Sequence, residues 1–396
     1  MERLKTLIAI CMLCISMQAC MQEDDAAEAK LLTGAMQTSE YIPLLEGKQV
    51  ALVSNHASRI EEIHLADTLL SLEVNIVKVF APEHGFRGIA DAGEMINNET
   101  DPKTALPIIS LYGSDKKPTR QSLENVDIIL FDLQDVGARF YTYIYTLTYV
   151  MEAAAESGIP VIVLDRPNPN GFYIDGPVLD KEYASFVGMH PVPIVYGMTI
   201  GEYGQMVNGE YWLADSIQCD LKVIPLKNYD RSKLYKLPVR PSPNLPTWES
   251  IYLYPSLCLF EGTVVSVGRG TDYPFTVYGH PDIKTGSFVF LPESRLGAKY
   301  PKLEGDTCYG QNLSGYAASF NEIREHFNLI WLLGAFEQLG NDTSFFTPYF
   351  DKLAGTSILR KQIISGTPID EIRTSWQEDL DAFNFIRKKY LIYEDF

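Results

Sequence analysis

Four apolar residues stand between two aspartates in the stretch Asp127-Ile128-Ile129-Leu130-Phe131-Asp132. A short run with no polar residue on either face is typical of a strand buried on both sides, because a half-exposed strand alternates apolar and polar residues. Similar runs, rich in β-branched residues, occur at 49–54, 75–80, 108–111 and 161–164, and a further strand is expected at 221–225.

Helical patterns separate these apolar runs. Apolar residues recur at helical spacing in 62–72, a long helix is expected at 140–157 before Gly158, and another is expected at 199–213. Short apolar strands that alternate with helices predict a parallel sheet covered on both faces. We therefore expect an α/β fold, a Rossmann-like, doubly wound and mostly parallel sheet, over residues 40–228.

The chain changes character after about residue 229. Prolines and glycines punctuate residues 238–281, which suits irregular loops and short strands. Amphipathic patterns then predict helices at 320–339 and 369–390. We assign residues 229–396 to a second, smaller α+β domain that contributes loops to the functional site.

Composition and charge narrow the classes of function. Hydrophobic residues make up 46% and charged residues 21% of the 396 residues, as in an ordinary globular protein. The net charge is −18, and such a chain repels phosphate backbones. We therefore expect no nucleic-acid partner.

The N-terminus has the pattern of a secretory signal. Arg3 and Lys5 precede an apolar stretch at 7–15, and Ala19 directly precedes Cys20. A small residue before a cysteine is the lipoprotein form of this signal, with ordinary cleavage nearby as the alternative. We expect a signal peptide at 1–19, a lipid on Cys20, a flexible tether at 20–39, and an exported lipoprotein anchored to a membrane, periplasmic or associated with the outer membrane. The oligomeric state is left open.

Two absences argue against a cofactor. Residues 54–58 follow the first strand and contain no glycine, which a dinucleotide pyrophosphate needs for close backbone approach. Beyond Cys20, only Cys219, Cys258 and Cys308 remain and none forms a Cys-x-x-Cys pair, so we expect at most one disulfide, buried free thiols rather than pairs, and no structural zinc.

Polar residues gather where the predicted strands end. Ligands of open parallel sheets bind outside the carboxyl ends of the strands, so these residues are expected to share one rim. Each also fits a structural role alone, as a helix cap or turn residue. The residues at strand ends are Asn55, His56, Glu83, His84, Arg87, Asp132, Gln134, Asp135, Arg139, Asp165, Arg166, Asn168 and Asn170, and the later loops add Asn244, Glu261, Arg269 and Thr271.

Three chemistries could use such a rim. A metal site could draw on His56, Glu83, His84 and Asp132, but their spacing matches no standard motif, and we expect no metal. Acyl transfer needs a nucleophile at a sharp turn beside a base, and none is evident. Glycoside hydrolysis needs a carboxyl group that holds its proton near neutral pH, and Glu83 fits because it follows an apolar strand.

Several segments resemble the NamZ/YbbC family of exo-β-N-acetylmuramidases. The resemblance covers about residues 41–390. Its motifs are long and distinctive: Val53-Ser54-Asn55-His56, Phe80-Ala81-Pro82-Glu83-His84-Gly85-Phe86-Arg87-Gly88, residues 131–143, Leu164-Asp165-Arg166-Pro167-Asn168-Pro169-Asn170-Gly171, Pro241-Ser242-Pro243-Asn244, residues 260–263 and residues 266–271.

This resemblance implies an exo-acting glycosidase that releases N-acetylmuramic acid from the non-reducing end of peptidoglycan fragments. It implies Glu83 as the catalytic acid. Our own candidates for the second carboxyl are Asp132, Asp135 and Glu261. Two alternatives stay open, a lipid-anchored protein that binds muropeptide sugars without cleaving them and a metal-dependent sugar hydrolase. The residues expected to bind substrate are Asn55, His56, His84, Arg87, Gln134, Asp135, Arg139, Tyr141, Asp165, Arg166, Asn168, Asn244, Arg269 and Thr271.

The lactyl carboxylate of muramic acid requires a cation in a protein of this net charge. Arginine suits it best, because its planar fork can pair both oxygens. We expect at least one of Arg87, Arg139 and Arg269 to face the pocket, and Arg166 to brace the site acids.

Overall fold

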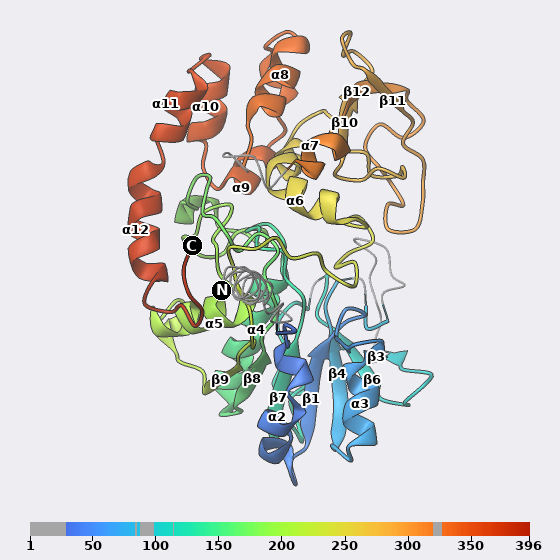
Figure 1. Cartoon of the computed structure of the whole chain (residues 1–396), viewed down its shortest axis with the longest axis vertical. Coiled ribbons are helices and arrows are strands. Elements are labelled where there is room, and N and C mark those ends of the chain that lie inside the picture. Colours follow the sequence, from blue (N-terminus) through green and yellow to red (C-terminus); the bar gives the residue numbers. More distant parts are fainter. Residues whose placement is uncertain (1–28, 84, 88–98, 114, 320–326) are drawn as a thin grey trace, which may run out of the picture. The chain divides into compact units, whose positions relative to one another are not determined.

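A seven-stranded sheet forms the first part of the fold. The computed structural model describes residues 29–83, 85–87, 99–113, 115–319 and 327–396, and Leu32–Phe396 form one compact unit (Figure 1). The strand order is β5-β6-β4-β1-β7-β8-β9, and all neighbours are parallel except β5 and β6. The strands are β1 (Val50–Ser54), β4 (Ile76–Ala81), β5 (Glu99–Thr100), β6 (Pro107–Ser110), β7 (Ile128–Asp132), β8 (Val161–Leu164) and β9 (Leu221–Ile224).

Helices cover both faces of this sheet. Alternate strand residues point to opposite faces, so Leu52 and Leu130 pack with α2 (Thr38–Leu45) and α3 (Leu65–Ser71), whereas Val53 and Phe131 pack with α4 (Tyr143–Ser157) and α5 (Ile200–Gly209). This confirms the doubly wound α/β prediction. The order of connection reverses between β1 and β7, which is where such folds bind ligands.

A smaller part with an antiparallel sheet follows in the chain. Its strands are β10 (Val277–His280), β11 (Phe288–Phe290) and β12 (Cys308–Asn312), with β12 in the middle. Figure 1 shows this sheet near α6 and α7. The helices are α6 (Trp248–Leu257), α7 (Ser314–Ala318), α8 (Ile330–Gln338), α9 (Tyr349–Ala354), α10 (Ile358–Ile364), α11 (Ile369–Thr374) and α12 (Gln377–Arg387).

Short elements complete the described chain. β2 (Arg59–Ile60) and β3 (Ile63–His64) form a small hairpin. The 3₁₀ turns are η1 (Gly34–Met36), η2 (Lys181–Tyr183), η3 (Ala214–Ser216), η4 (Cys258–Gly262) and η6 (Thr343–Phe345).

Several predicted helices are shorter than expected. The helix predicted at 62–72 begins only at Leu65, because the β2–β3 hairpin takes Ile63 and the His64 side chain accepts a hydrogen bond from the Ala66 amide. Of the helix predicted at 320–339, residues 320–326 lie outside the described residues, and α8 begins at Ile330. The helix predicted at 369–390 is two helices, because Trp376 leaves helical geometry between α11 and α12.

The predicted tether at 20–39 also needs correction. Ala35 is fully buried, the Gly34 amide donates to the Asp165 carbonyl at 2.9 Å, and Leu32 bridges to Lys227. The packed chain therefore begins by Leu32. The boundary at residue 228/229 stays a prediction, since Leu32–Phe396 form one unit.

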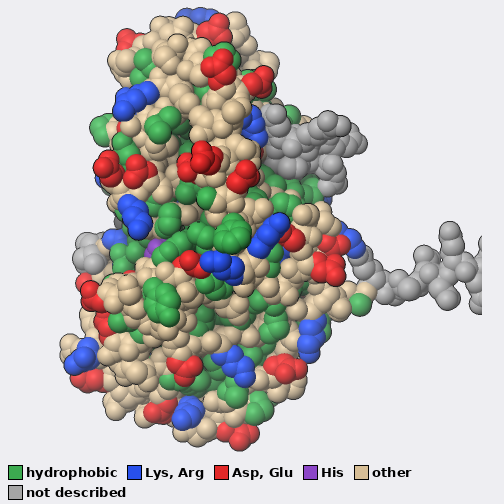
Figure 2. All heavy atoms as spheres, turned by 90° about the vertical axis from the view of Figure 1, so that its left-hand side faces the viewer, with side chains coloured by type: hydrophobic (Ala, Val, Ile, Leu, Met, Phe, Trp, Pro, Cys, Tyr) green, Lys and Arg blue, Asp and Glu red, His purple; other side chains and the backbone are tan. Residues whose placement is uncertain are grey.

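The surface and the cysteines agree with the composition. Acidic and basic side chains are interspersed on the face drawn in Figure 2. Cys219, Cys258 and Cys308 are free and buried, as expected. Within the described part of the chain, no helix combines the length and the apolar character needed to cross a membrane.

Candidate active site

A cavity of about 100 Å³ opens beside the end of β4 and the loop that follows β7. Residues from six separate segments line it, and hydroxyl, amide and aromatic groups dominate the lining. The lining residues are Glu83, Phe140, Tyr141, Thr142, Tyr143, Ser242, Asn244, Leu245, Tyr254, Arg269 and Phe275.

Glu83 is the acid of this cavity. It lies two residues after the last residue of β4 and is half-buried. Among the described residues that line the cavity, Glu83 is the sole carboxyl group. Its backbone carbonyl accepts a hydrogen bond from the Tyr143 hydroxyl at 3.4 Å, which ties the Glu83 turn to the start of α4.

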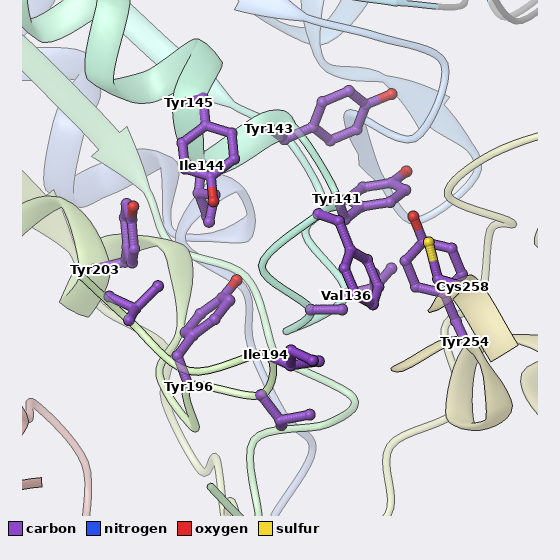
Figure 3. Packing of buried hydrophobic residues seen from close by; sticks show 14 of the residues in the cluster. Val136, Tyr141, Tyr143, Ile144, Tyr145, Ile194, Tyr196, Tyr203, Tyr254 and Cys258 are labelled. Carbon is purple, nitrogen blue, oxygen red and sulfur yellow. The ribbon is translucent and has the colours of Figure 1, made fainter. Parts of the chain in front are cut away.

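Three tyrosines surround the space next to Glu83. Figure 3 shows Tyr141, Tyr143 and Tyr254 on one side of the buried cluster, and the rings of Tyr141 and Tyr254 lie edge to face with centroids 6.1 Å apart. The rings of Tyr141 and Tyr143 meet edge to face with centroids 4.9 Å apart. Burial, and then the charge of Glu83, raise the pKa of Tyr143 well above its usual value, so this phenol stays protonated and can donate.

Asn55 holds one of these three tyrosines in place. It is fully buried at the end of β1, and its Nδ2 donates to the Tyr143 hydroxyl at 2.8 Å. Because Tyr143 accepts there, its own proton is directed elsewhere. Asn55, predicted to bind substrate, is thus outside the cavity lining and positions a tyrosine that lines it.

The loop after residue 240 supplies the opposite polar groups. Ser242 and Asn244 line the cavity, and Asn244 Nδ2 donates to the Gly297 carbonyl at 2.6 Å. The Tyr141 hydroxyl donates to the Pro241 carbonyl at 2.9 Å and so holds this loop against the β7–α4 loop. Tyr141 and Asn244 are both residues that the sequence predicted.

Arg269 is the cation of the cavity. Its Nη1 donates to Glu261 Oε2 at 3.1 Å, and the two side chains are 28% and 23% exposed. Glu261, a predicted catalytic carboxyl, is therefore engaged by Arg269 and does not itself line the cavity.

Two predicted site acids are buried in structural contacts. Asp132 is fully buried and pairs through both oxygens with Arg166, at 2.5 and 2.7 Å. Arg166 does brace a site acid, but the acid is Asp132 rather than its neighbour Asp165. Asp165 accepts from Thr199, Gly201 and Tyr393, which joins β8 to α5 and to the C-terminal end. Burial raises the pKa of Asp165 to about 6.

Four more predicted residues are buried behind the site. Gln134 donates to the carbonyls of Asp135 and Pro167, and Asn168 donates to the Met198 carbonyl. Asp135 accepts from the Gly137 amide and the Tyr196 hydroxyl, and burial raises its pKa to about 6. Arg139 is fully buried and donates to the carbonyls of Pro177, Val192, Leu353 and Ala354.

The remaining predicted residues lie apart from the cavity. His56 and Arg87 line a different hollow, and Arg87 pairs with both oxygens of Asp101. Thr271 closes a turn by donating to the Gly268 carbonyl at 2.6 Å. His84, predicted to bind substrate, and Cys20, predicted to carry a lipid, lie outside the described residues. Within the described residues, no three His, Cys, Asp or Glu side chains are grouped to hold a metal.

Sequence reasoning missed several lining residues. Thr142 and Tyr143 follow Tyr141 directly, and Ser242 precedes Asn244 by two positions, so both segments carried a usable signal in the motifs themselves. Tyr254 carried none, because it lies within α6 and looks like a core aromatic until the helix is packed against the β7–α4 loop.

Comparisons with known proteins indicate the same family for both parts of the chain. Residues 50–249 match the family described as Exo-beta-N-acetylmuramidase NamZ, N-terminal, and residues 252–393 match its C-terminal counterpart. A Bacillus subtilis (strain 168) protein described as Peptidoglycan beta-N-acetylmuramidase NamZ is 42% identical over 376 residues, 89% of each chain.

Two solved structures from Bacteroides fragilis NCTC 9343, both of DUF1343 family proteins, are similar in fold. One has a TM-score of 0.87 at 46% identity and covers 93% of this chain and 100% of its own. The other has a TM-score of 0.76 at 29% identity and covers 92% of this chain and 99% of its own.

Proposed function

Because this chain belongs to the NamZ family of exo-β-N-acetylmuramidases, we propose that it hydrolyses the bond that holds N-acetylmuramic acid at the non-reducing end of peptidoglycan fragments, with Glu83 as the general acid. The observation that carries this proposal is the cavity itself. It combines one carboxyl group with hydroxyl and amide groups and with aromatic walls, which is a set suited to a sugar ring.

The first step of the reaction is a proton transfer. Glu83 gives its proton to the glycosidic oxygen while the bond from C1 to that oxygen breaks, and the electron pair of the bond leaves with the oxygen. Positive charge then develops at C1 and on the ring oxygen. The Tyr143 contact to the Glu83 backbone supports this role, because it limits movement of the acid.

The group that attacks C1 comes from the substrate in this proposal. Glu83 is the only acid among the described lining residues. Of the other candidate carboxyls, Asp132 and Glu261 are each paired with an arginine, and Asp135 is buried and accepts from the Gly137 amide and the Tyr196 hydroxyl. The carbonyl oxygen of the substrate's own N-acetyl group therefore bonds to C1. Water then attacks C1 and gives a proton to the Glu83 carboxylate, while the bond from C1 to the acetamido oxygen breaks and its electron pair returns to that oxygen. The sugar is released with its configuration retained, as in other substrate-assisted glycosidases.

The hydrolysis is tested with two disaccharides, one ending in N-acetylmuramic acid and one in N-acetylglucosamine at the non-reducing end. Mass spectrometry of the products from the mature protein should show free N-acetylmuramic acid from the first. Absence of any cleavage, with sugar binding retained, would instead support a binding protein.

The route is tested by the anomer formed first. Proton NMR during the reaction should show the β-anomer, since two displacements at C1 restore the configuration. Appearance of the α-anomer first would exclude attack by the N-acetyl group.

We also propose that the protein is exported and carries a lipid on Cys20. The support is the sequence alone: a basic start, an apolar stretch and Ala19 before Cys20. Radiolabelled palmitate fed to the cells should label the full-length protein, and Cys20→Ser should abolish the label and release the protein from membranes. A Cys20→Ser protein that stays labelled would refute the anchor.

A further inference from the structure

We propose that Arg269 binds the lactyl carboxylate of the substrate and that Glu261 is its positioning residue rather than a catalytic carboxyl. The inference rests on the proposed function, since it assigns the muramic-acid specificity of the same cavity. Muramic acid differs from glucosamine by this lactyl ether, so a residue that binds the carboxylate distinguishes the two sugars.

The other candidate arginines are already engaged. Arg139 donates to four backbone carbonyls, Arg166 pairs with both oxygens of Asp132, and Arg87 pairs with both oxygens of Asp101. None of these three lines the cavity. Arg269 is the one cationic side chain among the described residues that line it.

Arg269 has donors left for a ligand. A guanidinium carries five N–H donors, and within the described part of the chain Arg269 uses Nη1 alone, toward Glu261 Oε2 at 3.1 Å. Its side chain is 28% exposed and therefore reachable. A carboxylate can take the remaining donors in a bidentate pair, the geometry for which arginine is best suited.

The backbone around Arg269 is fixed by two glycines. Gly268 and Gly270 have φ of +75° and +81°, which favour glycine, and a Cβ on Gly270 would lie 2.5 Å from the Glu293 carbonyl oxygen. Thr271 closes this turn through the Gly268 carbonyl. The loop therefore presents Arg269 from a defined backbone, which lowers the entropy lost on binding.

The backbone that carries Glu261 is also held in place by hydrogen bonds. Lys302 Nζ donates to the backbone carbonyls of Phe260 at 2.9 Å and Thr263 at 2.6 Å, on both sides of Glu261. This clamp fixes η4 and with it the carboxylate that contacts Arg269. A carboxylate placed this way fixes the guanidinium plane, and its single hydrogen bond leaves the rest of the fork to the substrate.

Charge explains why this arginine is needed. The protein carries a net charge of −18, and Glu83 lines the same cavity, so an anionic substrate is repelled unless a local cation offsets the field. Glu83 and Arg269 line the same cavity of about 100 Å³, so one bound sugar can contact both side chains.

The test compares three substrates: the muramic-acid disaccharide, the same disaccharide with its lactyl carboxylate converted to the primary amide, and the N-acetylglucosamine disaccharide. Arg269→Ala should lower kcat/KM for the acid about 10- to 100-fold, the scale of a charge-assisted hydrogen bond. It should change kcat/KM for the other two less than about threefold. Arg295→Ala is the matched control, because Arg295 pairs with Asp272 outside the cavity.

The role of Glu261 is tested by measuring KM and kcat separately in two variants. Glu261→Ala should raise KM for the acid several-fold with kcat nearly unchanged, and Glu261→Gln, which keeps an acceptor for Arg269, should restore most of the loss. A catalytic carboxyl would lose kcat on every substrate in both variants, and that result would overturn the assignment.

Binding separates this inference from the proposed function. Calorimetry with free N-acetylmuramic acid and N-acetylglucosamine is run on Glu83→Gln protein with and without Arg269→Ala. A selective loss of N-acetylmuramic acid affinity supports the inference even if no hydrolysis is seen. Equal affinities in the two proteins, or equal losses for both sugars, would overturn it, and Arg269→Gln serves as the second variant if the alanine protein unfolds.

Discussion

Replacement of Arg139 by methionine should destabilise the protein strongly while leaving its substrate contacts intact. The Arg139 side chain is fully buried and donates four hydrogen bonds of 2.7 to 2.9 Å, to the carbonyls of Pro177, Val192, Leu353 and Ala354. Burial lowers the pKa of Arg139 to about 10, so the group is charged at neutral pH. Methionine fills a similar volume and donates nothing.

The magnitude follows from the carbonyls left behind. All four carbonyls lose the arginine, but the Val192 carbonyl keeps the Leu179 amide as a donor, so within the described chain three carbonyls are left without a hydrogen-bond donor. At about 1–3 kcal/mol for each unsatisfied buried group, the loss is about 3–9 kcal/mol. Relief from burying a charge offsets part of it, and a net destabilisation of about 3–5 kcal/mol is expected.

Urea unfolding followed by circular dichroism measures this difference, with Arg295→Met as the exposed control, expected to change stability by less than about 0.5 kcal/mol. For folded Arg139→Met protein, kcat/KM should stay within a few-fold of the wild type, because Arg139 is absent from the cavity lining. A destabilisation below about 1 kcal/mol, or a large loss of kcat/KM at unchanged stability, would refute this reasoning.

Two further predictions concern the layer behind the cavity. Tyr143→Phe removes the acceptor of Asn55 Nδ2 and the hydrogen bond to the Glu83 backbone. The free energy of unfolding should therefore fall by about 1–3 kcal/mol, and kcat should fall more than KM rises. An unchanged kcat would mean that Tyr143 does not hold Glu83 in place. The raised pKa of Asp135, about 6 against an ordinary 3.8, means that between about pH 4 and 6 the folded state keeps a proton that the unfolded state has released, so this group's contribution to stability is lost as pH rises through that range. This loss is at most about 3 kcal/mol and should be absent from Asp135→Asn. If the free energy of unfolding changes equally between pH 4 and pH 7 in the wild type and in Asp135→Asn, the prediction is wrong.

The sheet could be predicted because its signal is local. Unbroken apolar runs such as Ile128–Phe131 mark strands buried on both faces, and β7 and β8 are buried throughout their lengths. The helix ends were harder to predict, because they depend on tertiary packing. α4 begins at Tyr143 rather than at Phe140, and helical geometry is interrupted at Trp376 between α11 and α12.

The site could be predicted only in part. Position after a strand placed Glu83 correctly in the cavity, but the same rule also selected Asp132, Asp165 and Arg139, which are buried. A sequence position does not tell whether a polar side chain points to a ligand or to a backbone carbonyl. That choice depends on contacts between distant segments, such as Arg139 with Leu353.

Lining residues from the later chain show the same limit. Arg269 was one of three candidate arginines, and only the fold shows that, of these three, it is the one that lines the cavity together with Glu83. Tyr254 was not predicted, since nothing in an apolar helix marks the residue that will face a cavity.

The most direct test of the account is the turnover of Glu83→Gln on two substrates. Glutamine keeps the shape of the side chain but cannot give a proton, so kcat on the muramic-acid disaccharide should fall about 10²- to 10⁴-fold. An aryl N-acetylmuraminide, whose leaving group departs without a proton, should lose far less activity in its first step. Near-wild-type turnover of the disaccharide by Glu83→Gln would contradict the assignment of Glu83 as the general acid.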